Sequence, residues 1–117
     1  MVLADTSVWI QHLRCGEQAL ADRLSDGLVL MHPFVCGELA CGNLKDRAAT
    51  LWYLRALPVV KPASDDEVLQ LIDVRRLWGR GLGWIDAHLL ASALLAGCRF
   101  WTLDKRVRQA VTELGLS

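Results

Sequence analysis

Residues 1–10, MVLADTSVWI, decide the fold class of this 117-residue chain. The apolar run before Asp5 has the length of a short buried strand, and Asp5, Thr6 and Ser7 are residue types that commonly begin helices. A strand that turns directly into a helix is the usual start of an α/β fold. We therefore expect Asp5 to lie at the carboxyl end of the first strand.

The same alternation continues to the end of the chain. The apolar runs LVLM (28–31) and RFWTL (99–103) predict strands, and VVKP (59–62) predicts a strand or an extended link. Capping residues, glycines and prolines delimit further helices, which we expect at 17–27, 33–42, 45–57, 64–79, 84–97 and 104–114. This order predicts one domain over residues 1–117, an α/β/α three-layer sandwich with a short, mostly parallel central sheet. Because little sequence follows Leu114, a last edge strand is expected to be absent or minimal.

Composition limits the classes of partner. The 13 basic and 13 acidic residues cancel, so any nucleic-acid site must be a local patch. The hydrophobic fraction of 53% leaves apolar surface for a second chain, and Leu51, Trp52, Leu54 and Leu57 crowd one helix. We expect a homodimer. With no basic leader and no apolar run long enough for a membrane span, we also expect a cytoplasmic protein without membrane contact.

Other reactive residue types favour structural roles. The four cysteines have no C-x-x-C pairing and stand in apolar company, which is typical of reduced thiols in a core and argues against a zinc site. The three histidines are scattered, so none is assigned to a site. Core packing is the default expectation for the five tryptophans, although exposed ones can stack on nucleobases.

Four acidic residues interrupt apolar stretches: Asp5, Glu38, Asp86 and Asp104. A carboxylate in such company is costly to desolvate unless it is paired, hydrogen-bonded or bound to a metal. Three of the four stand at expected helix starts, where an aspartate is also a good N-cap, so each taken alone has a structural explanation. Glu38 falls in mid-helix and has no such explanation.

The expected topology brings the four acids to one edge of the sheet. Asp5 and Asp104 follow strands, and the carboxyl ends of strands are where open α/β sheets bind ligands. Oxygen ligands without His or Cys select Mg²⁺ or Mn²⁺ over zinc. Such ions, held by carboxylates, activate water for phosphodiester hydrolysis. Arg80, Lys105 and Arg106 are candidates for a positive rim that binds the nucleic-acid backbone, although a solvated helix face is the default explanation for such basic residues.

Four motifs carry a family resemblance: DTSVWI (5–10), GELACG (37–42), GWIDAHLLASALL (83–95) and TLDKRV (102–107). In this order and spacing they resemble the PIN-domain family, in particular the VapC ribonuclease toxins of bacterial toxin–antitoxin pairs. The resemblance implies that Asp5, Glu38, Asp86 and Asp104 form the catalytic metal site, with Thr6, Ser7 and Thr102 as supporting hydroxyl groups. It also implies Mg²⁺-dependent cleavage of structured RNA such as transfer or ribosomal RNA, dimerisation, and inhibition by a cognate antitoxin. Contact with promoter DNA is expected only through that antitoxin.

Two other functions compete with a ribonuclease toxin. A catalytically idle PIN-like binding or scaffold module is expected to have lost one of the acids, and none is missing. An aspartyl-phosphate phosphatase needs a second aspartate two residues after its nucleophile, and Ser7 occupies that position.

Overall fold

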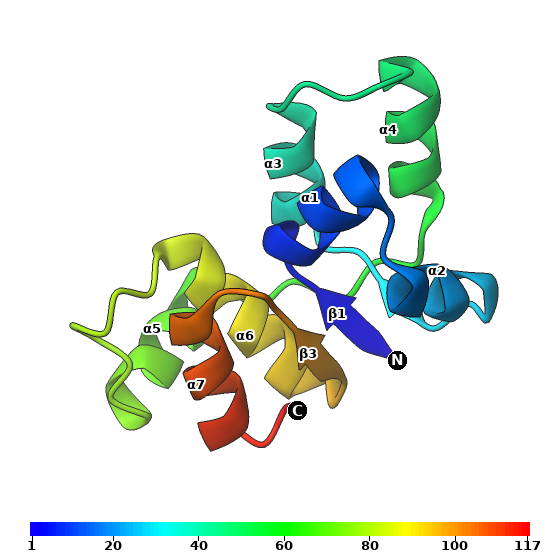
Figure 1. Cartoon of the computed structure of the whole chain (residues 1–117). Helices are drawn as coiled ribbons and strands as arrows, with labels where there is room; N and C mark the ends of the chain where they lie inside the picture. Colours follow the sequence, from blue (N-terminus) through cyan, green and yellow to red (C-terminus); the bar gives the residue numbers. More distant parts are fainter.

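The computed structural model describes residues 1–117 and contains three strands and seven helices. In chain order these are β1 (Val2–Ala4), α1 (Thr6–Cys15), α2 (Gln18–Ser25), β2 (Val29–Leu30), α3 (Pro33–Ala40), α4 (Arg47–Ala56), α5 (Asp65–Val74), α6 (Trp84–Ala96), β3 (Arg99–Trp101) and α7 (Lys105–Glu113). Figure 1 shows α3 and α4 side by side, away from the group formed by α5, α6 and α7.

The three strands form one parallel sheet in the order β2-β1-β3. Leu3 of β1 is paired with Leu30 of β2 on one side and with Phe100 of β3 on the other. Beyond β3 the amide of Phe100 donates to the carbonyl of Leu116 at 2.8 Å, but the chain forms no further strand there. β1 is therefore the central strand, and residues that follow β1 and β3 leave the sheet at the same edge.

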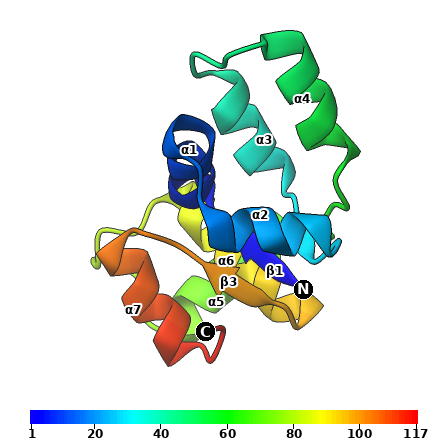
Figure 2. The same cartoon turned by 45° about the vertical axis from the view of Figure 1, so that its right-hand side comes forward.

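Crossover handedness explains why helices cover both faces of this sheet. The connection from β1 to β2 steps one way across the sheet, and the connection from β2 to β3 steps back the other way. Because parallel crossovers are right-handed, the two connections lie on opposite faces. α2 packs against β2 and α6 against β3, and Figure 2 shows α2 and α6 on different sides of the strands. The expected three-layer α/β/α arrangement with a short parallel sheet is confirmed.

Local sequence signals account for most helix boundaries. Asp5 caps α1, its side chain accepting from the amide of Val8, and Asp104 caps α7 in the same way. Ser64 and Glu67 form the expected capping box of α5, with reciprocal hydrogen bonds of 3.1 and 2.8 Å. Gly97 ends α6 at a φ of +68°, a left-handed conformation that glycine adopts without a steric penalty. VVKP is an extended link, with a single bridge between Met31 and Val59.

The expected extension of α5 to Gly79 is wrong. The helix ends at Val74, and Arg76 adopts a left-handed conformation with a φ of +53°. This turn lets the amide of Leu77 bond to the carbonyl of Ile72 and buries the Leu77 side chain. The Arg75 guanidinium donates to the carbonyl of Glu113 on α7. Tertiary contacts thus override a helical sequence pattern.

Two expectations about the core also need correction. Trp9 is fully buried, but Trp52, Trp78 and Trp84 are 75%, 60% and 45% exposed. Among the cysteines, Cys98 is buried and Cys36 partly so, while Cys15 and Cys41 are exposed; all four are free. Periodic apolar spacing therefore places a residue on a helix face without showing that the face is covered. No helix of the structure has the length and apolar character needed to cross a membrane.

Candidate active site

Asp5 lies at the carboxyl end of β1 and is 5% exposed. Its backbone amide donates to the carbonyl of Trp101 at 3.0 Å, which fixes the residue to β3. Its Oδ1 accepts hydrogen bonds from the Ser7 hydroxyl and the Val8 amide. Burial raises the pKa of the Asp5 carboxyl, and hydrogen bonds from Ser7, Thr102 and Val8 partly offset that rise. Of the four acids, Asp5 is the one that bears the desolvation cost expected from the sequence.

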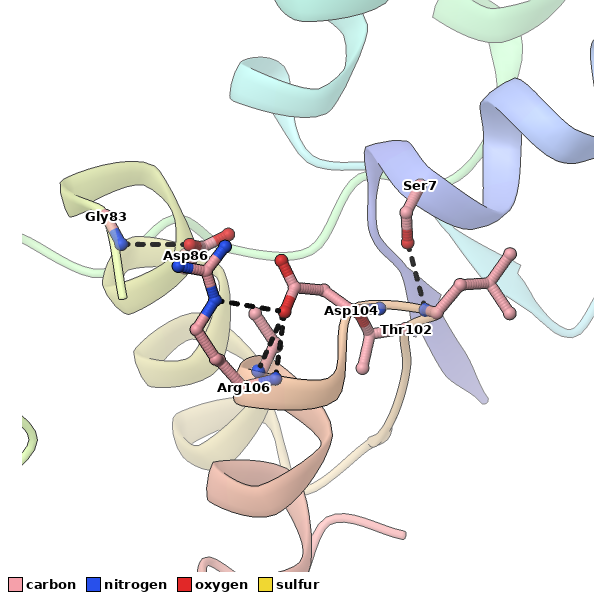
Figure 3. Close-up of polar contacts among 8 residues, drawn as sticks. Ser7, Gly83, Asp86, Thr102, Asp104 and Arg106 are labelled. Atoms are coloured by element: carbon pink, nitrogen blue, oxygen red, sulfur yellow. Dashed lines mark hydrogen bonds and ion pairs between the residues drawn. The ribbon is translucent and has the colours of Figure 1, made fainter. Parts of the chain in front are cut away.

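Asp104 reaches the same edge from β3. Thr102 is buried, and its Oγ1 accepts from the amide of Asp104 at 3.0 Å. Ser7 joins the two strand ends, because its hydroxyl donates to Asp5 and accepts from the amide of Leu103 at 3.0 Å. Figure 3 shows Ser7, Thr102 and Asp104 along this edge. The hydroxyl residues expected to support the site therefore hold the two strand-borne aspartates in register.

Glu38 comes from α3, and its exposure corrects a sequence interpretation. Although its neighbours in the chain are apolar, Val35 and Leu39 face the core while Glu38 is exposed. Its Oε1 accepts from the Thr6 hydroxyl at 2.8 Å. Because Thr6 follows Asp5 directly, this bond attaches α3 to the edge of the sheet at which Asp5 lies.

Asp86 lies in the first turn of α6. Its Oδ2 accepts from the amide of Gly83 at 2.9 Å, a capping interaction visible in Figure 3. The residue is partly buried, and its side chain is drawn beside those of Asp104 and Arg106. Asp86 therefore serves as a helix cap and faces the same region as Asp104.

Three of these carboxylates share a pattern of hydrogen bonding. Glu38, Asp86 and Asp104 each accept all their hydrogen bonds through one oxygen: Oε1, Oδ2 and Oδ1, respectively. The second oxygen of each is free of protein donors. No three acidic, histidine or cysteine side chains are close enough to bind one ion together in the structure. The donor set nevertheless fits a hard cation such as Mg²⁺, because it consists of carboxylate and hydroxyl oxygens, with one oxygen each of Glu38, Asp86 and Asp104 free of protein donors.

The PIN domain family model matches residues 2–112, nearly the whole chain. The chain belongs to the PIN-domain family. It is also 48% identical, over 118 aligned residues, to Ribonuclease VapC32 from two strains of Mycobacterium tuberculosis. The alignment covers 100% of this chain and 95% of the relative. The resemblance inferred from the four sequence motifs is thereby confirmed, including its VapC type.

Basic residues border this PIN-domain site unevenly. Arg106, in the first turn of α7, has its Nε 3.7 Å from Asp104 Oδ1, and Lys105 beside it is exposed. Arg80 instead forms an ion pair of 2.7 Å with Glu113, at the far end of α7. Of the three basic residues considered for RNA binding, Lys105 and Arg106 therefore lie beside Asp104. Arg80 is instead held away from it by its ion pair with Glu113.

A contact between Arg106 and Gly81, in the loop GRGLG (79–83), has no counterpart among the sequence predictions. Gly81 has a φ of +79°, and a Cβ placed on it would lie 2.8 Å from Cδ of Arg106. A side chain at this position would displace Arg106, so the glycine lets the arginine lie across the loop before α6. The only signal of this contact in the sequence is the glycine-rich segment that ends at Gly83, three residues before Asp86.

Proposed function

We propose that this protein is a Mg²⁺-dependent endoribonuclease toxin of the VapC type, which hydrolyses phosphodiester bonds in structured RNA such as transfer or ribosomal RNA. The observation that supports the proposal is that Asp5 and Asp104 follow neighbouring strands at one edge of the sheet. The Thr6 hydroxyl binds Glu38 at this edge, and Asp86 is drawn beside Asp104. The oxygen-only donors of these residues favour Mg²⁺, with Mn²⁺ as a substitute. The 48% identity to a relative named Ribonuclease VapC32 supports RNA as the substrate.

The chain's own residues prepare this site for hydrolysis. Asp5, Glu38, Asp86 and Asp104 would hold the ion, which supplies an activated water and neutralises charge on the phosphate. Ser7 orients Asp5 through a hydrogen bond to Oδ1, and Thr6 orients Glu38 through Oε1. Thr102 fixes the turn that presents Asp104. Lys105 and Arg106 border the site and would bind the RNA backbone.

Chelation tests the metal requirement. The purified protein should cleave RNA with Mg²⁺ or Mn²⁺ and lose all activity in excess EDTA, because the bound ion would both lower the pKa of the attacking water and neutralise charge on the phosphate. The matched control is the Asp5→Asn variant, purified identically, which reports any contaminating ribonuclease. Cleavage by the wild type that persists in EDTA and is absent from this control contradicts the metal mechanism.

We further propose that a cognate antitoxin inhibits the protein by placing an arginine among the four acids. A guanidinium can pair with two carboxylate oxygens, and Glu38, Asp86 and Asp104 each keep one oxygen free. Inhibition should weaken when that arginine is changed to alanine. A complex that leaves the acids open to metal and RNA contradicts this mode of inhibition.

A homodimer is the proposed assembly. Trp52 on α4 is 75% exposed while Leu54 beside it is fully buried, so α4 carries an aromatic residue that its own core does not cover. Light scattering across a dilution series measures the mass. A monomer at every concentration contradicts the proposal.

A further inference from the structure

Two aromatic side chains at the acidic edge are exposed to solvent. Phe34 on α3 is 39% exposed and Trp84 on α6 is 45% exposed. Neither ring is needed to fill the main core, whose buried aromatic residues are Trp9 and Phe100. Exposed aromatic rings that gather beside polar residues form a candidate binding surface.

Both rings are held from behind by the same buried histidine. The His88 imidazole is 3% exposed and meets Phe34 edge to face with ring centroids 4.9 Å apart. It meets Trp84 in the same manner at 4.5 Å and an interplanar angle of 86°. His88 Nε2 lies 3.1 Å from Asp65 Oδ1 of α5. The two rings therefore form a supported surface, which we call the Phe34–Trp84 platform.

The platform adjoins one of the four acids directly, Glu38. Phe34 precedes Glu38 by four residues on α3, so both side chains lie on one face of that helix. Trp84 lies in the first turn of α6, where residues two apart point to different faces of the helix, and it joins Phe34 through their shared contact with His88. The basic residues Lys105 and Arg106 belong instead to α7. An RNA strand crossing the acids thus has cations available for its phosphates from one element and aromatic faces for its bases from two others.

We propose that the Phe34–Trp84 platform stacks an unpaired nucleobase of the RNA substrate next to the bond that is cut. This inference rests on the proposed ribonuclease function and adds a condition to it: the cleaved nucleotide lies in a single-stranded loop or bulge of the structured RNA. Aromatic side chains bind unstacked bases through their π-faces, and recognition of RNA loops depends on such stacking.

The flanking charges favour a nucleobase over a second copy of the chain. Covering the platform with protein would also cover Glu38 and would remove its carboxylate from water, at a cost that needs compensating partners. A nucleotide would cover the rings with its base and leave the Glu38 carboxylate accessible. The experiment below distinguishes a protein contact at this surface from an RNA contact.

The experiment compares Trp84→Leu with Trp78→Leu. Trp78 is 60% exposed and lies in the turn after α5, so it controls for the loss of an exposed indole. Trp84→Tyr restores an aromatic face, and melting temperatures verify that each variant folds. The probe is a pool of RNA hairpins with randomised single-stranded loops, from which the best-cleaved hairpin is taken. Binding of the same hairpin is measured with Ca²⁺ in place of Mg²⁺, so that binding is measured apart from cleavage. If the wild type cleaves no hairpin, binding of the whole pool is measured instead.

We expect Trp84→Leu to weaken hairpin binding and kcat/KM by about 10-fold, within the range that one base stacked on an aromatic ring contributes. Phe34→Leu should act in the same direction, and Trp84→Tyr should recover most of the loss. A hairpin lacking the base beside the cut should bind the wild type as weakly as the intact hairpin binds Trp84→Leu, and removing the base should not weaken Trp84→Leu further. This non-additivity identifies the indole and the base as partners.

The outcomes separate this inference from the proposed function. A wild type that does not cleave but binds the hairpins in a Trp84-dependent manner supports the platform and contradicts the ribonuclease proposal. Equal binding by Trp84→Leu and Trp78→Leu overturns the platform, whether or not the wild type cleaves. A Trp84→Leu protein that loses its dimer mass but binds RNA normally overturns it in favour of a protein interface. A wild type that neither binds nor cleaves RNA overturns both.

Discussion

The four acids reach the site in two ways, from strand ends and from helices. Asp5 and Asp104 follow neighbouring strands, and backbone bonding between Asp5 and Trp101 together with the Ser7 bridge fixes their separation. Glu38 and Asp86 stand on α3 and α6, each held by a single hydrogen bond. We call Asp5 and Asp104 the strand-borne half of the candidate site and Glu38 and Asp86 the helix-borne half. The sheet itself fixes the strand-borne half, whereas the position of the helix-borne half depends on how α3 and α6 pack.

The largest expected effect is a loss of RNA cleavage that is greater for a change in the strand-borne half than for the matched change in the helix-borne half. Asp5→Asn should lower single-turnover RNA cleavage by more than about 100-fold, the upper end for residues that only support metal ligands. Asparagine keeps an oxygen that can accept from Ser7 and Val8, so the loss reflects the missing charge. Glu38→Gln, the matched change on a helix, should cost less because Glu38 is exposed and its position can adjust. A greater loss from Glu38→Gln would reverse the proposed ranking of the two halves.

Acid pH should destabilise α3, the helix that carries Glu38, because its N-cap His32 becomes protonated. Its Nδ1 accepts from the amide of Phe34, and the side chain is fully buried. Burial lowers the pKa of His32 from 6.5 to about 4, and the nearby His88 adds to the effect. Since the unfolded chain binds this proton more readily, stability falls as the pH drops from 6.5 towards 4 and not above that window.

The expected loss at the acid end of this window is roughly 3 kcal/mol, from about 1.4 kcal/mol per pKa unit. Denaturant unfolding across the window measures it against His32→Asn, a variant that keeps an N-cap acceptor but does not titrate there. Hydrogen exchange should show α3 opening at lower pH than β1. Parallel stability curves for the wild type and His32→Asn would show that His32 contributes nothing to the acid response.

The Ser7 bridge gives a smaller and more local test. Ser7→Ala removes the hydroxyl that joins Asp5 to the amide of Leu103, and activity should fall by roughly 10- to 100-fold, as for other supports of metal ligands. The affinity for Mn²⁺, measured by calorimetry, should fall in step. Thr6→Val is the matched change beside Glu38 and should cost less. If Thr6→Val proves the more damaging, the strand ends are not the better-ordered half.

The positions of Asp5 and Asp104 could be predicted from the sequence more accurately than those of Glu38 and Asp86, for a physical reason. A short apolar run followed by Asp5 or Asp104 combines a strand signal and an N-cap signal within a few residues, and both are local. The capping box at Ser64 and the stop at Gly97 are local as well. These signals placed the elements and predicted a mostly parallel sheet, whereas the strand order β2-β1-β3 is seen only in the structure.

The helix-borne half depends on long-range packing, and there sequence reasoning was less accurate. Apolar neighbours suggested a buried Glu38, but a helix turns successive residues to different faces and Glu38 is exposed. The same limit applies to Trp84, whose periodic position suggested core packing. The early end of α5 at Val74 depends on the contact between Arg75 and α7, which no local pattern reports.

The smallest expected effect on stability concerns Asp86, which serves as both a cap and a candidate metal ligand. In Asp86→Asn the amide oxygen can still accept from Gly83, while the charge that repels the other acids is removed and some favourable interaction with the helix dipole is lost. The opposing terms should leave the metal-free protein as stable as the wild type or more so, within about 0.5 kcal/mol. Cleavage should nevertheless end, and most of the rise in melting temperature on adding Mg²⁺ or Mn²⁺ should disappear, because that rise depends on affinity for the folded state. Thermal scans of both proteins, with and without metal, measure the two effects separately. Strong destabilisation of metal-free Asp86→Asn would mean that Asp86 acts chiefly as the cap of α6, and the helix-borne half of the site would then rest on Glu38 alone.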